Sequence, residues 1–226
     1  MAEKTKIIEK VKHEKIEFID LMFSDLSGRL KSVTISPREL SDVLENGKWF
    51  DGSAVEGFTR IHESDMLLIP DTPTYILLPW TRDEKNVARI ICDVREPNKT
   101  SFTGDPRYIL RRVQDKAKEI GYSYNVGPEM EFFLFKSKEA RAYHDTASYF
   151  DFSPLDLATD IRAVMVSTLE KLGIHVEMSH HEVAPSQHEI DFEYSDALIN
   201  ADSVMILKQA IKTVASSRGL YATFMP

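Results

Sequence analysis

Hydrophobic and polar positions change their spacing several times within the first fifty residues, and each change predicts an element. Residues 3–15 place isoleucine and valine on one helical face, so we expect an amphipathic helix there. Apolar runs over 16–23 and 29–35 indicate two strands joined by a turn that ends in glycine. Ser-Pro-Arg-Glu at 36–39 is a capping box with proline at the first helical position, and it predicts a short helix that stops at Asn46-Gly47.

Three further apolar runs follow before residue 95. The ranges 66–69, 75–78 and 87–94 each have the length and composition of a strand. One sheet crossed by a short helix would make a small α+β domain. The polar stretch 95–104 is then the expected domain boundary.

Beyond that boundary, helical and strand patterns alternate. We expect helices over 105–120, 153–173 and 196–218, and strands over 122–135, 174–182, 189–194 and 221–224. The chain stops where the last strand opens, which suggests a fragment of a longer chain. A short terminal strand that completes a sheet edge explains the same ending nearly as well.

Composition narrows the possible function classes. The 226 residues are enough for a core without disulfides or structural metal. The 28 basic and 36 acidic residues give a net charge of −8, and no basic run suggests nucleic-acid binding. We also expect no membrane span and no signal peptide, because no stretch is long and apolar enough. The lone Cys92 excludes an intramolecular disulfide and points weakly to a reducing compartment such as the cytoplasm.

The first candidate site is the segment Gly-Pro-Glu-Met-Glu-Phe-Phe-Leu-Phe at 127–135. On a strand, Glu129 and Glu131 point to the same side, and the alternate apolar residues point into the core. Two neighbouring carboxylates raise each other's pKa, and a divalent cation relieves their repulsion. Taken alone, the pair fits a solvated strand face with two ordinary acids better than a site.

The second candidate spans 180–191 and contains three histidines and three acids around a proline turn. A hairpin would bring Glu182 and Glu189 together. Because acids replace thiols entirely, Mg²⁺ or Mn²⁺ fits this set better than zinc. For His180 and His188 we prefer a supporting or core role to direct metal binding.

The third candidate is an aromatic and glycine-rich loop over 49–60. Asp51 either caps an Asx turn there or is presented by the loop to a site elsewhere, and composition does not choose between these. No glycine-rich phosphate loop occurs in the chain, so any nucleotide would be held mainly through metal ions.

Together these segments resemble type I glutamine synthetases of the archaeal and Gram-positive form. The resemblance rests on four stretches in order along the whole chain: FDGSAVEGFTRIHESDM, GPEMEFFLF, SHHEVAPSQHEIDF and ATFMP. It implies an N-terminal β-grasp domain over 14–98. It also implies the first part of an antiparallel-sheet catalytic domain over 105–226, incomplete at its C-terminus. The implied reaction joins glutamate and ammonia, with ATP, through γ-glutamyl phosphate.

The resemblance also implies roles for the acids. Glu131, Glu182 and Glu189 would hold one Mg²⁺ or Mn²⁺ ion, and Glu129 would contribute to a second. Asp51 would bind ammonium and take its proton, reaching in from a neighbouring subunit. Asp51 and Glu131 are therefore the implied catalytic residues.

Further positions match nucleotide and regulatory residues of the family. Glu177 would contact ATP, Tyr194 would lie near adenine, and Arg60 would sense glutamine in feedback-inhibited relatives. Such enzymes assemble as two stacked six-membered rings with sites shared between subunits. Ala54 and His62 depart from the common pattern, which puts regulation rather than chemistry in doubt.

Two alternatives stay open beside an N-terminal portion of a working enzyme. The Asn-Gly-Ser-Gly-Met-His segment of the family is absent, so we expect residues 1–226 alone to be inactive. The chain therefore also fits a non-catalytic homologue that docks with full-length rings. A γ-glutamyl ligase that uses another amine is the third reading, which Asp51 weakly disfavours.

Overall fold

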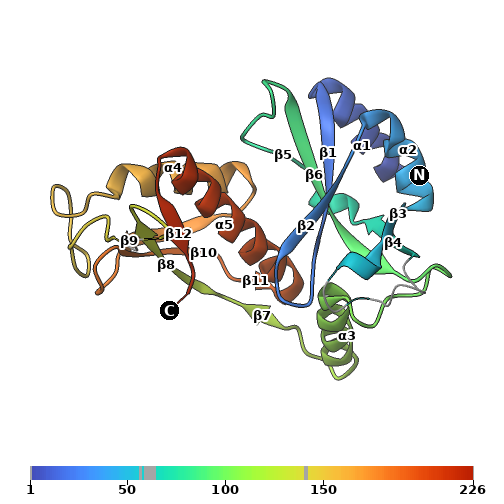
Figure 1. The fold of residues 1–226 in the computed structure, drawn as a ribbon. Coiled ribbons are helices and arrows are strands. Elements are labelled where there is room, and N and C mark those ends of the chain that lie inside the picture. The colour runs from blue at the N-terminus through green and yellow to red at the C-terminus, as the bar shows by residue number, and fades with distance from the viewer. Residues whose placement is uncertain (1, 56–57, 59–64, 140–141, 226) are drawn as a thin grey trace. The chain divides into compact units, whose positions relative to one another are not determined.

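The computed structural model describes residues 2–55, 58, 65–139 and 142–225 (Figure 1). The predicted glutamine-sensing Arg60, and His62 with it, lie outside the described residues. The chain divides into two compact units, Met1–Ser123 and Tyr124–Pro226, and each is described by itself. Within the described ranges, no helix is both long and apolar enough to span a membrane.

The first unit is built on a mixed six-stranded sheet. Its path is β2-β1-β6-β4-β3, with β5 paired to β6, and β1 and β6 are its parallel neighbours. The strands are β1 Ile16–Ser24, β2 Leu30–Ile35, β3 Lys48–Asp51, β4 Asp65–Pro70, β5 Ile76–Leu77 and β6 Asn86–Arg95. The helices are α1 Ala2–His13, α2 Leu40–Asn46 and α3 Pro106–Glu119, with short 3₁₀ turns η1 Pro37–Glu39, η2 Gly52–Ala54 and η4 Thr72–Thr74.

The core of this unit lies between the sheet and the first two helices. Ile7 and Val11 of α1, and Leu40 and Val43 of α2, are buried in one cluster with the inner side chains of β1, β4 and β6. This is the helix face that the apolar spacing of residues 3–15 predicts. The mixed sheet with helices packed against it is the expected α+β arrangement.

Helix α3 belongs to the first compact unit, although it follows the polar stretch 95–104. The guanidinium of Arg107 forms ion pairs with Asp71, at 2.8 Å, and with Asp93. Asp105 caps the helix, because its carboxylate accepts a hydrogen bond from Arg107 N and another from Val94 N on β6. The compact units therefore divide at a later residue than the polar stretch.

The second unit holds a four-stranded antiparallel sheet in the order β12-β8-β10-β9. These strands are β8 Glu129–Phe135, β9 Val176–His181, β10 Gln187–Phe192 and β12 Tyr221–Thr223, and a separate pair joins β7 Asn125–Val126 to β11 Ser195–Asp196. The helices are α4 Thr159–Lys171 and α5 Ala197–Ser217. α4 packs on α5 and β9, and α5 also packs on β12.

Alternation along the strands separates this sheet into two faces. Phe132 and Leu134 of β8 and Ile190 of β10 are fully buried, as are Leu169 of α4 and Ile211 of α5. These apolar side chains form the core between sheet and helices. The alternate positions of β8 and β10 point to the opposite face, which carries the acids.

Three element predictions were wrong in detail. The loop expected over 49–60 begins instead with strand β3, because residues 48–51 pair with β4. α4 begins at Thr159 rather than at 153, because the buried carboxylate of Asp156 accepts a hydrogen bond from Ala158 N and fixes a turn before the helix. The strand expected over 122–135 is interrupted at Gly127-Pro128 and pairs with different partners on either side.

Candidate metal centre

The antiparallel register of three strands places acids in rows on one sheet face. Glu189 of β10 lies opposite Glu131 of β8 and opposite His180 of β9. One step along, Asp191 lies opposite Glu129. Directly opposed residues share a face, so all five side chains point to the same side of the sheet.

Three carboxylates converge at the end of this face. One oxygen each of Glu131, Glu182 and Glu189 lies within 4.8 Å of the other two. Glu182 follows β9 directly, and its backbone N donates to Gln187 O at 2.8 Å, which closes the turn between the two hairpin acids. The structure thus brings together the three acids that the resemblance assigns to one ion.

His180 lies between two of these acids and is almost fully buried. Its Nδ1 is 3.4 Å from Glu182 Oε1, and its Nε2 is 3.3 Å from Glu189 Oε2. The third carboxylate also has a partner, because the side-chain amide of Gln187 donates a hydrogen bond to Glu131 Oε2. Each of the three carboxylates therefore has a histidine or amide neighbour that fixes its direction, as the residues around metal ligands do in metal sites.

The electrostatics of the cluster favour a cation. Burial, followed by contact with Glu182 and the charges of Asp191 and Glu131, raises the pKa of Glu189 to about 8. Burial, with the charges of Glu129 and Glu177, also raises the pKa of Asp191. An all-carboxylate donor set suits a hard ion such as Mg²⁺ or Mn²⁺ better than zinc. The residues present therefore fit the expected divalent cation.

The other predicted residues of this unit lie at the far end of the same strands. Glu129 is exposed beside Asp191, and among the described residues it does not join the three-carboxylate cluster. Glu177 is exposed on β9. Tyr194 is exposed after β10, where its Cβ lies 3.3 Å from the position a Cβ on Gly127 would take.

Asp191 is a candidate site residue that the sequence analysis counted among the acids of the second segment without giving it a role. It points to the acidic face, and its Oδ1 is buried without a hydrogen-bond partner. The signal was available, since a strand that directs Glu189 to one side directs residue 191 to the same side.

Asp51 belongs to the first compact unit, while the carboxylate cluster belongs to the second. It ends β3, and its Oδ1 accepts hydrogen bonds from Ser53 Oγ at 2.7 Å and Ser53 N at 2.8 Å. These two hydrogen bonds lower the pKa of Asp51. The side chain is thus an exposed, ionised cap of η2. This is the Asx turn, one of the two interpretations of Asp51 that the sequence left open.

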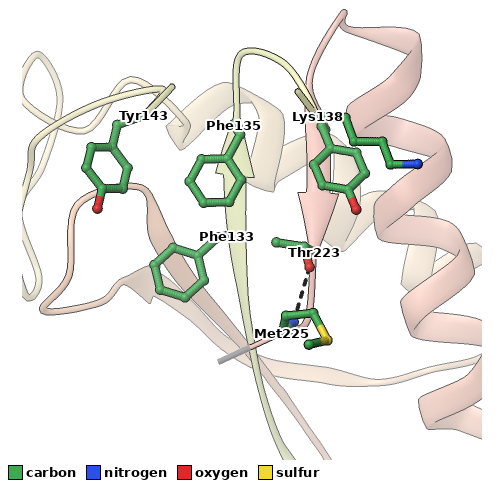
Figure 2. Close-up of a pocket in the computed structure, with 7 residues that line it drawn as sticks. Phe133, Phe135, Lys138, Tyr143, Thr223 and Met225 are labelled. Carbon is green, nitrogen blue, oxygen red and sulfur yellow. Dashed lines mark hydrogen bonds between the residues drawn. The ribbon is translucent and has the colours of Figure 1, made fainter. Parts of the chain in front are cut away.

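An aromatic pocket of about 380 Å³ lies on the sheet beyond the cluster. Figure 2 shows Phe133 and Phe135 of β8 beside Thr223 of β12, with Tyr143 and Lys138 at the rim. By alternation and pairing, Phe133, Phe135 and Thr223 share the face of Glu131. The acidic face therefore continues into an apolar wall.

Comparisons with known proteins agree along the whole chain. Residues 15–97 match the model described as glutamine synthetase, beta-Grasp domain, and residues 103–226 match glutamine synthetase, catalytic domain. A glutamine synthetase of Clostridium saccharobutylicum is 48% identical over 232 residues, covering 100% of this chain and 52% of the relative. One of Methanosarcina mazei is 47% identical, covering 99% of this chain and 51% of the relative.

Solved structures show the same relationship. The glutamine synthetase of Plasmodium falciparum has a TM-score of 0.88 at 28% identity, covering 99% of this chain and 50% of that one. A GmaS/ADP complex has a TM-score of 0.88 at 31% identity, covering 97% of this chain and 51% of that one. The chain thus spans about half the length of the relatives it matches. With its β-grasp domain and antiparallel catalytic sheet, this chain belongs to the glutamine synthetase family.

Proposed function

We propose that this chain is the N-terminal portion of an ATP-dependent ligase that joins ammonia to L-glutamate, giving L-glutamine through γ-glutamyl phosphate. The observation that carries the proposal is the cluster of Glu131, Glu182 and Glu189 in a chain that matches both family domains. The proposed domain limits are 14–98 and 105–226.

The three clustered carboxylates would hold one Mg²⁺ or Mn²⁺ ion, and Glu129 would contribute to a second. A bound divalent ion supplies positive charge that stabilises phosphoryl transfer from ATP to the glutamate side chain. The chain's own contribution is positioning. His180 and Gln187 fix the directions of the ligand carboxylates before any ion binds.

The remaining roles follow from the positions of single residues. Glu177 and Tyr194 lie toward the Glu129 end of the acidic face, which supports contacts to ATP and its adenine there. Asp51 is ionised and exposed, as binding of ammonium requires. We propose Arg60 as a glutamine-sensing residue on the resemblance alone.

We also propose that the protein works as a homo-oligomer of two stacked hexameric rings in the cytoplasm, with Asp51 completing the site of a neighbouring subunit. Its proposed partners are glutamate, ammonium and ATP, with neither nucleic acid nor membrane. A mixing experiment tests the sharing. Inactive Asp51→Ala and Glu131→Ala subunits should regain part of the activity when assembled together, and mixed rings as inactive as each parent would contradict a shared site.

A non-catalytic homologue that docks with full-length rings is the second candidate, since the chain spans about half the length of its relatives. One assay separates the two. The protein at its full natural length, rather than residues 1–226 alone, is given ATP, glutamate, ammonium and Mg²⁺ or Mn²⁺, and phosphate release and glutamine are measured. We expect Glu131→Gln to lose activity and the exposed control Glu193→Gln to keep it. Equal activity in both variants would refute the assignment, and no activity in the wild-type protein would favour the docking homologue.

A further inference from the structure

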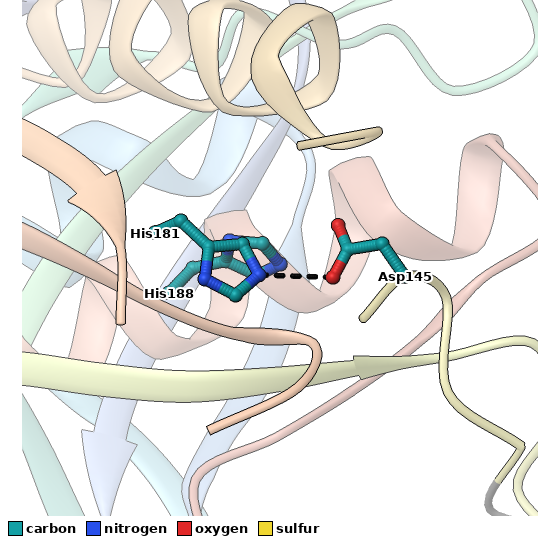
Figure 3. Close-up of side chains that lie close together, drawn as sticks. All are labelled: Asp145, His181 and His188. Carbon is teal, nitrogen blue, oxygen red and sulfur yellow. Dashed lines mark hydrogen bonds and ion pairs between the residues drawn. The ribbon is translucent and has the colours of Figure 1, made fainter. Parts of the chain in front are cut away.

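A buried carboxylate outside the acidic face makes contacts that the proposed reaction does not use. Asp145 lies in the loop that follows β8 and is 5% exposed. Its Oδ1 lies 2.9 Å from Nε2 of His181 and accepts a hydrogen bond from Ser186 N at 3.1 Å. Its Oδ2 accepts one from Leu157 N at 3.2 Å. Figure 3 shows this carboxylate pointing at the His181 ring, with His188 beside it.

The backbone of Asp145 adds two contacts to the same turn. Its N–H donates to Ser186 Oγ at 2.9 Å, and Ser186 Oγ donates to its carbonyl oxygen at 3.1 Å. Ser186 is fully buried and has a φ of +60°, in the left-handed region that a serine seldom adopts. Such a conformation persists where surrounding contacts over-determine it, and Asp145 supplies most of those contacts.

These contacts hold both ends of the turn that connects the proposed metal ligands Glu182 and Glu189. His181 directly precedes Glu182, and Ser186 lies three residues before Glu189. The Nδ1 of His181 lies 2.6 Å from the carbonyl oxygen of Glu182. A shift of Asp145 would therefore move the backbone from which Glu182 projects.

We propose that Asp145 is a positioning residue: it clamps the 182–187 turn through His181 and Ser186, and so fixes Glu182 against Glu189 and Glu131. The proposal rests on the metal site of the proposed function. Asp145 itself would not touch the ion held by Glu131, Glu182 and Glu189.

A metal ion held by Asp145, His181 and His188 is the alternative, since one ligating atom of each lies within 4.8 Å of the others. The guanidinium of Arg162 argues against it. Its NH1 lies 3.1 Å from Nδ1 of His188, so the lone pair of Nδ1 accepts and the proton is assigned to Nε2. Nε2 then offers no lone pair to a metal, and the fixed positive charge beside the ring repels one.

The test measures Mn²⁺ affinity in the intact protein. Asp145→Asn keeps the size of the side chain but turns one of its acceptor oxygens into a donor. We expect the dissociation constant of Mn²⁺, measured by calorimetry, to rise 10–100-fold, as for other residues that orient metal ligands. Asp160→Asn, at an exposed acid in the first turn of α4, is the matched control and should bind like wild type. Saturating Mn²⁺ should restore most of kcat in Asp145→Asn, which general loss of structure would not allow.

Amide hydrogen exchange gives a readout that needs no metal. In metal-free protein, the amides of Glu182 and Ser186 should exchange faster in Asp145→Asn than in Asp160→Asn. If Asp145→Asn does not fold, Ser186→Ala, which removes two of the clamp's hydrogen bonds, should show a smaller change in the same direction.

Unchanged Mn²⁺ affinity and unchanged exchange in the folded variant would overturn the proposal, as would one equivalent of tightly bound zinc lost with Asp145→Asn. A wild-type protein that does not bind Mn²⁺ would instead refute the proposed function, while the exchange comparison would still decide whether Asp145 holds the turn.

Discussion

Arg162 and Asp156 form a buried ion pair, and Arg162 also contacts His188 of the β9–β10 hairpin. Removing the arginine alone should destabilise the protein strongly. The NH2 of Arg162 donates to Asp156 Oδ2 at 2.6 Å, and the two side chains are 8% and 0% exposed. In Arg162→Met the carboxylate would stay buried without its counter-charge. Breaking such a pair from one side costs about 3–5 kcal/mol.

Two companion variants make the measurement specific. Arg111→Met removes a guanidinium that is 39% exposed and pairs with Asp93 at 3.1 Å, so it should cost about 0–1 kcal/mol. The double variant Arg162→Met/Asp156→Asn removes both buried charges and should be more stable than Arg162→Met. The assay is urea unfolding at pH 7, monitored by circular dichroism.

The stability that Arg162→Met loses should depend on pH, and the pKa of Asp156 gives the direction of that dependence. Burial pushes the pKa of Asp156 up, but hydrogen bonds from Arg162, Ala158 N and Thr159 outweigh it, so the folded-state pKa lies below the usual value. The stability from this group is therefore present above the unfolded pKa of about 3.9 and is lost as pH falls through the folded pKa. The deficit of Arg162→Met should shrink in acid. A deficit below about 1 kcal/mol at pH 7, or one that grows in acid, would refute the reasoning.

Other predictions concern the first unit. Burial raises the folded-state pKa of Asp105 to about 6, so the contribution of this carboxyl to stability should fall by about 2–3 kcal/mol as pH rises from about 4 to 6. Urea unfolding should show this fall as the change, over that pH range, in the stability difference between wild type and Asp105→Asn, and a constant difference would contradict it. Gly47→Ala should lower Tm more than Gly28→Ala, although both glycines have a positive φ. A Cβ at Gly47 would lie 2.6 Å from Ile69 Cδ1, whereas a Cβ at Gly28 would have no heavy atom within 4 Å. Equal shifts of Tm in calorimetry would count against this. Burial raises the pKa of the Cys92 thiol, so a disulfide reagent should label it only after unfolding; rapid labelling of folded protein would show that the thiol is accessible.

Local pattern predicted the elements of the site well because the relevant physics is local. Period-two alternation is enough to place Glu129 and Glu131 on one face of a strand. A proline turn of six residues is enough to bring Glu182 near Glu189. The structure also places His188 in the core, fully buried beside Arg162, as the sequence reading preferred.

Contacts between segments far apart in the chain could not be predicted from the sequence pattern. Asp145 meets His181 across 36 positions, and nothing in the polar loop around it signals a buried acid. Strand β3 was missed because its residues alternate between half-buried and exposed, and pairing with β4 decides its conformation. The helix start at Thr159 likewise depends on the buried Asp156, whose partner Arg162 lies a turn further along.

Strand β8 places Phe132 and Leu134 on its buried face and Glu129 and Glu131 on the opposite face, so the positions of the two acids depend on how the core packs. A slip of one residue would bury Glu129 and Glu131 and expose Phe132 and Leu134, an exchange that costs both desolvation of charge and loss of apolar burial. The carboxylates repel one another when no cation is bound, so their mutual interaction does not hold the strand in register. The packing of Phe132 and Leu134 against the helices does so instead, and the precision of the proposed metal site is in this sense a property of the hydrophobic interior.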